Sequence, residues 1–166
     1  MEPHFSSIAQ DFIERQLHRY VLSSSRFLFW TDTGLADNPR IERLDLTGEN
    51  PTVIVDFSLY QSYPMSVIVD YETETIHWID RYFHEFQQAD MDGNNVVYNA
   101  YIGQNINPTD LALLGDSIYW ADRNSHSVEF LNKTQKLGMH YNLGHLTDEY
   151  PTGVVVSDKS RQPVGK

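Results

Sequence analysis

The chain of 166 residues contains no cysteine, which excludes a disulfide framework, a zinc site built from cysteine and a thiol nucleophile. Basic residues are scarce, with 12 Lys and Arg against 23 Asp and Glu and a formal net charge of −11. Because phosphate binding needs clustered basic side chains, we expect no nucleic-acid partner, and basic protein partners fit better. No apolar run approaches the roughly 20 residues that cross a bilayer, and no export signal is visible, so we predict no membrane span in this chain.

Motifs for catalysis and phosphate binding are also lacking. There is no Gly-x-Ser-x-Gly elbow, no His-Glu-x-x-His pair and no glycine-rich phosphate loop. The segment DMDGNN at 90–95 begins like a calcium loop, but Tyr101 stands where that loop needs its bidentate Glu. We therefore predict no catalytic residue, no cofactor and no metal site.

The main positive signal is an internal repeat. The segments FLFWTD (27–32), TIHWID (75–80) and SIYWAD (117–122) each place Trp two residues before Asp. A Pro-led apolar segment recurs at 64–69, 108–113 and 151–156, before the second and third copies and again after the third. A later turn contains Gly after two of the three copies. The residues of this motif are Trp30, Asp32, Trp78, Asp80, Trp120, Asp122, Pro64, Pro108, Pro151, Gly48 and Gly93.

Each repeat reads as four short strands separated by Gly, Asn, Asp and Pro turn signals. In the Trp-bearing strand, alternation places Trp and Asp on one face and Phe29, His77 or Tyr119 on the other. Four-stranded units that repeat every 40 to 45 residues or so are typical of a β-propeller. The predicted fold class is therefore all-β, a propeller in which Trp and Asp serve packing and turn formation.

The motifs WTD, WID and WAD, with the Pro-led strand and the Asp-x-x-Gly segment, resemble the YWTD repeats (class B repeats) of the low-density lipoprotein receptor family. Segments 69–95 and 111–134 are similar to the large receptor-related members. This resemblance implies a six-bladed ring in the extracellular part of a plasma-membrane and endosomal receptor. It also implies protein ligands, neighbouring EGF-like and ligand-binding modules, ligand uptake, and release of ligand in acid, without enzymatic activity.

The chain departs from that family in its number of blades. We expect an unassigned segment at 1–19, a partial YWTD-type propeller at 20–163 and a tail at 164–166. Three blades are predicted at about 20–55, 64–98 and 108–139, followed by a lone closing strand at 151–156. An incomplete propeller, corresponding to the C-terminal half of a six-bladed ring, is the simplest interpretation.

Other interpretations remain open. WD40 propellers place Asp directly after Trp, whereas one residue intervenes here. A calcium-dependent propeller hydrolase of the lactonase kind would need acidic or amide ligands in a central channel, and a secreted YWTD interaction protein could pair as a dimer. Asn132 begins the open glycosylation sequon Asn-Lys-Thr, and four histidines on expected loops are weak candidates for a pH switch: His84, His126, His140 and His145.

Overall fold

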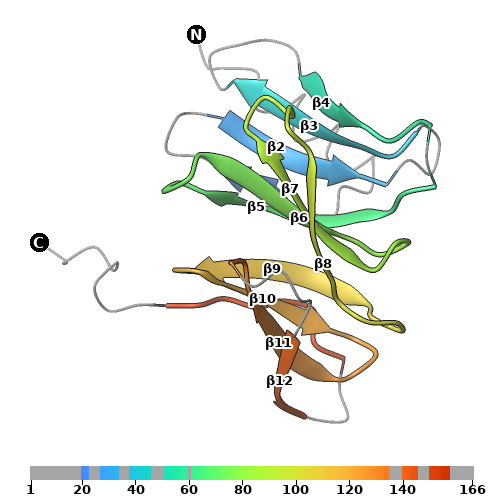
Figure 1. Ribbon diagram of the computed structural model, residues 1–166, viewed down its shortest axis with the longest axis vertical. Coiled ribbons are helices and arrows are strands. Elements are labelled where there is room, and N and C mark those ends of the chain that lie inside the picture. The colour runs from blue at the N-terminus through green and yellow to red at the C-terminus, as the bar shows by residue number, and fades with distance from the viewer. Residues whose placement is uncertain are drawn as a thin grey trace, which may run out of the picture.

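The computed structural model describes residues 20–22, 27–33, 38–45, 51–59, 61–134, 140–145 and 150–157. These ranges contain strands and no helix, arranged as three sheets stacked one upon another (Figure 1). The first sheet comprises β1 (Tyr20–Leu22), β2 (Phe27–Asp32), β3 (Arg40–Asp45) and β4 (Thr52–Asp56). The second comprises β5 (Pro64–Asp70), β6 (Thr75–Asp80), β7 (Glu85–Asp90) and β8 (Val97–Tyr101). The third comprises β9 (Pro108–Leu114), β10 (Ser117–Asp122), β11 (Ser127–Asn132) and β12 (His140–His145).

In every sheet the strands pair antiparallel in chain order, so each sheet is a meander of four neighbouring strands. The Trp-bearing strands β2, β6 and β10 all occupy the second place. The predicted all-β, propeller-type architecture is confirmed, with three sheets that correspond to the three sequence repeats. The sheets are called blades below.

Strand ends are capped by a recurring turn. Several strands end in Asp or Asn, whose Oδ1 accepts the backbone N–H two residues later, an arrangement that these residue types favour. The donor–acceptor distances are 2.8–3.0 Å at Asp56, Asp70, Asp80, Asp90, Asp122 and Asn132. The high Asp content therefore has a structural use within the hairpins.

The blades bury their faces against one another. Trp78 of the second blade packs in one apolar cluster with Phe29 and Ile41 of the first, and its ring centroid lies 6.1 Å from that of Phe57. Trp120 of the third blade packs in another cluster with Ile79 and Phe86 of the second. Both indoles are fully buried. Each of these tryptophans thus faces the preceding blade, which explains why the repeat needs a large apolar residue at this position.

Two fourth strands differ from the expected boundaries. The second blade extends to Tyr101 rather than residue 98, and the third ends with β12, beyond the expected limit at residue 139. The sequence HYNLGH of β12 has no β-branched residue and contains Gly and Asn, so its pattern favours a loop. Pairing of Phe130 with Tyr141 and of Leu131 with His140 makes it a strand, because the neighbouring β11 supplies the hydrogen-bond partners.

The expected closing strand at 151–156 is not a regular strand, although it lies beside β9. Thr109 Oγ1 donates to the Pro151 carbonyl oxygen at 3.2 Å, and the Val154 N–H donates to Asp110 Oδ2 at 2.9 Å. Both contacts involve side chains of β9, and no strand of a fourth blade lies outside the segment within the described residues. A strand without a sheet partner lacks the backbone hydrogen bonds that define it.

Candidate functional site

Asp80 ties two loops together at the end of β6. Its Oδ1 accepts backbone N–H groups from Tyr82 at 2.8 Å, Phe83 at 3.1 Å and Tyr63 at 3.3 Å. Its Oδ2 accepts the hydroxyl of Ser62, and the Asp80 side chain is fully buried. A carboxylate with so many donors is committed to holding the turn after β6 against the loop before β5.

Asp122 repeats this arrangement in the third blade. Its Oδ1 accepts the backbone N–H groups of Asn124 at 2.8 Å and Ser125 at 3.1 Å, and its Oδ2 accepts that of Asn107 at 2.9 Å. Asp32 in the first blade forms an ion pair with Arg40, at 2.9 Å. The three aspartates lie on three different blades, so they do not form a carboxylate pair that could act on one substrate atom.

The three tryptophans differ in their polar contacts. Trp30 donates its indole N–H to Glu42 Oε2 at 2.8 Å, and both residues are buried. The indole nitrogens of Trp78 and Trp120 are buried without a hydrogen-bond partner in the described part of the chain. Apolar packing is therefore the shared role of the motif, and the hydrogen bond is particular to the first blade.

The prolines and glycines of the repeat occupy boundaries. Pro64 and Pro108 are the first residues of β5 and β9, where a missing N–H is tolerated, and Pro151 begins the segment beside β9. Gly93 has φ +80°, and a Cβ there would lie 1.9 Å from the carbonyl oxygen of Ile54 on β4. Gly48 lies outside the described residues.

The four histidines that were candidates for a pH switch lie on turns or in a strand. His84 and His126 close the four-residue turns after β6 and β10 with φ of 58° and 53°, a left-handed conformation that shortens the turn. The expectation that His140 and His145 lie on loops is wrong, because both belong to β12. His140 Nε2 lies 3.1 Å from Oε2 of the buried Glu129.

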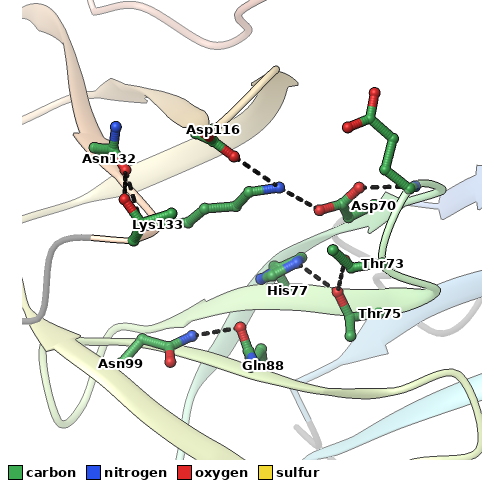
Figure 2. A network of polar contacts seen from close by, with 11 residues as sticks. Asp70, Thr73, Thr75, His77, Gln88, Asn99, Asp116, Asn132 and Lys133 are labelled. Atoms are coloured by element: carbon green, nitrogen blue, oxygen red, sulfur yellow. Dashed lines mark hydrogen bonds and ion pairs between the residues drawn. The ribbon is translucent and has the colours of Figure 1, made fainter.

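A polar network that the repeat did not reveal joins the second and third blades (Figure 2). Lys133, in the turn after β11, reaches across to donate its ammonium to Asp70 at the end of β5. The exposed side-chain fractions are 11% for Lys133 and 4% for Asp70, so the ion pair is nearly removed from solvent. The Lys133 backbone N–H also donates to the Asp116 carbonyl oxygen at 2.8 Å.

Two titratable groups near Lys133, Asp70 and His77, have perturbed pKa values. Burial raises the pKa of Asp70, but hydrogen bonds from Lys133, Thr73 and the Glu72 backbone outweigh it and hold the pKa below its ordinary value of 3.8. Burial lowers the pKa of His77 to about 4, with the nearby Lys133 charge acting in the same direction and Asp70 opposing. His77 is consequently neutral at pH 7.

His77 is held by few polar contacts. Its Nε2 lies 2.8 Å from Thr75 Oγ1, and its ring stacks on Phe86 with centroids 5.4 Å apart. The alternation along β6 predicted that His77 packs on the face opposite Trp78. It could not predict that the Lys133 charge lies near His77, because the two residues are 56 positions apart in the sequence. Only the strand-end pattern of Asp70 could have drawn attention to this network beforehand.

Turns gather different side chains at the two edges of the blades. Among the described residues at the edge that contains the Lys133 turn, four carboxylates are exposed, and we call them the acidic edge: Glu72, Glu74, Asp92 and Asp116. At the opposite edge, the described turns and loops expose large, mostly aromatic side chains, and we call them the aromatic edge: Leu59, Tyr82, Phe83 and Tyr150. Within the described ranges no group of three His, Cys, Asp or Glu side chains is placed to hold a metal ion. No helix there is long and apolar enough to cross a membrane.

Meander blades that pack through a repeated Trp-x-Asp strand define a β-propeller, and the spacing of the motif is that of the YWTD type. The chain is similar to a chain of the crystal structure of a nidogen/laminin complex, with a TM-score of 0.65 and 25% identity. That match covers 80% of this chain and 49% of the nidogen/laminin chain. The solved structure therefore supports the propeller interpretation independently of the motif.

Relatives of this chain include fly proteins. The chain is 34% identical over 108 residues to Protein cueball of Drosophila yakuba, and 33% identical over 106 residues to that of Drosophila willistoni. Each match covers 62% of this chain and 16% of the relative, so the chain spans about a sixth of these proteins' length. No family model matches the chain.

Proposed function

We propose that the chain is part of an extracellular, non-enzymatic β-propeller that binds protein partners. The observation that carries this proposal is its likeness to a chain of the nidogen/laminin complex, in which two proteins associate. The local geometry agrees with a binding role. The Asp80 and Asp122 carboxylates accept backbone N–H groups, so the exposed turns are the surfaces left to contact a partner.

The acidic edge is the surface we propose for a basic partner. Glu72 and Glu74 lie on the turn after β5, and Asp116 lies on the adjacent turn after β9, all exposed. Their negative charges are part of the net charge of −11, which favours association with a basic protein surface. The aromatic edge, with Tyr82 and Phe83, carries side-chain types that often anchor protein interfaces and is the natural comparison surface.

The finer proposal is an endocytic receptor related to the lipoprotein receptors, in which this propeller sits beside EGF-like and ligand-binding modules and helps release ligand in acid. Its support is the YWTD-type repeat itself. We also propose that the blades are half of a six-bladed ring. Tyr119 occupies the position that is buried as Phe29 in the first blade, yet it stacks at 5.4 Å on a partly exposed Phe130. Another blade would cover this aromatic face.

The test is a binding experiment with matched variants. The full chain, purified and immobilised, is incubated with extracellular-matrix extract, and captured proteins are identified by mass spectrometry and remeasured individually by interferometry. Glu72→Gln with Glu74→Gln should weaken binding of a basic partner at least tenfold, whereas Tyr82→Ser with Phe83→Ser should leave it unchanged. Equal affinity for the wild-type chain and the acidic-edge variant would contradict the proposed surface.

Two further measurements separate this function from the alternatives. A hydrolase screen with metal analysis addresses the calcium-dependent hydrolase, since stoichiometric calcium together with turnover would overturn a non-enzymatic role. Sedimentation velocity addresses the paired secreted protein, because a stable dimer would supply the second half of the ring from another copy.

A further inference from the structure

We propose that Asn132 carries an N-linked glycan and that the blade is built to accept it without loss of its packing. This inference rests on the proposed extracellular function, since the modification requires passage through the secretory pathway. The sequon Asn132-Lys133-Thr134 is the only open one in the chain, because Asn50-Pro51-Thr52 and Asn107-Pro108-Thr109 are blocked by proline.

The turn uses only the oxygen of the Asn132 side chain. Oδ1 accepts the Thr134 backbone N–H at 2.9 Å and the Thr134 hydroxyl at 2.6 Å. In the second blade the same place is taken by Asp90, whose Oδ1 caps its turn in the same way. A carboxylate is therefore sufficient for the cap. Asn132 differs from Asp90 by its amide nitrogen, which the cap does not need.

The amide nitrogen and the next side chain point in different directions. Figure 2 shows the Asn132 nitrogen directed away from the dashed contacts of the network, while Lys133 extends toward Asp70. Lys133 is only 11% exposed, whereas Thr134 is exposed. A sugar on Asn132 would project from the edge of the blade, and the ion pair between the blades would remain in place.

The experiment expresses the full chain behind a cleavable secretion signal in insect cells. Signal cleavage, read by intact mass, shows that the chain entered the secretory pathway, whether it is recovered from the medium or from the membrane fraction. We expect a mass decrease on treatment with peptide N-glycosidase and conversion of Asn132 to Asp in the peptide map. Cleaved chain without any glycan at Asn132 would overturn the proposal.

Matched variants separate the glycan from the turn. Asn132→Asp removes the acceptor but keeps the cap, so it should lose the mass shift and retain the wild-type thermal midpoint. Thr134→Ser should keep the modification and Thr134→Ala should abolish it. If deglycosylated and glycosylated wild-type chains differ strongly in thermal midpoint, the sugar contacts the packed blade and the proposed outward placement is wrong. A glycosylated chain that binds no protein partner would contradict the proposed function alone.

Discussion

Replacing His77 with Phe should remove a measurable part of the acid sensitivity of the fold. His77 is buried and its pKa is lowered from 6.5 to about 4, so the folded chain resists protonation of a group that the unfolded chain protonates readily. Between these two values the unfolded state binds more protons, and stability must fall as the pH falls. From pH 7 to pH 5 the wild type should lose about 2 kcal/mol of unfolding free energy through this residue alone.

Other groups near His77 do not mimic this effect. Asp70 has its pKa below 3.8, so its stabilising charge is present throughout the window and is lost only at lower pH, as pH falls through the pKa of the folded state. Phe is compatible with the site, because Phe29 fills the equivalent position of the first blade with no exposed surface. The stacking partner Phe86 can pack against a phenyl ring as it does against imidazole.

Urea denaturation at pH 7 and pH 5 measures the difference. The wild-type midpoint should fall by about 1 M at the lower pH, whereas His77→Phe should shift much less. His84→Gln is the matched control, since its ring lies half-buried on a turn, and it should keep the wild-type response. If His77→Phe loses as much stability as the wild type between these pH values, burial of this imidazole is not the source of the acid sensitivity.

Three further predictions concern contacts between blades and within turns, and each is tested by measuring the free energy of unfolding. Gly93→Ala should cost more than about 2 kcal/mol, because a Cβ would meet the Ile54 carbonyl oxygen at φ +80°, and an unchanged midpoint would show that this turn can move away from β4. Lys133→Ala should cost about 3 kcal/mol by leaving the buried Asp70 carboxylate unpaired, and Asp70→Asn in that background should recover part of it; no recovery would refute the ion-pair explanation. Asp80→Ala should cost about 2 kcal/mol by leaving partly buried backbone donors unpaired, whereas Asp80→Asn should cost less, and equal losses would argue against the hydrogen bonds as the cause.

Some predictions failed where neighbours override local preference. The segment at 140–145 has poor strand propensity, and β11 nevertheless pairs with it and brings His140 beside Glu129. The segment at 151–156 shows the reverse, since its Pro-led apolar pattern predicts an inner strand but no outer strand pairs with it among the described residues. In both cases the partner strand decides, and a partner is a property of the assembled sheet.

The sequence by itself determined the all-β repeat, the positions of the strand-end turns and the places of the tryptophans. Each of these depends on local alternation and on turn chemistry within a few residues, which repetition makes visible. The tertiary structure alone decided that Lys133 meets Asp70 and that His77 is held neutral near them. It also decided that Gly93 lies against Ile54. These contacts join residues on different blades, and their energies depend on burial and on the distance between atoms, which appear only when the blades pack together.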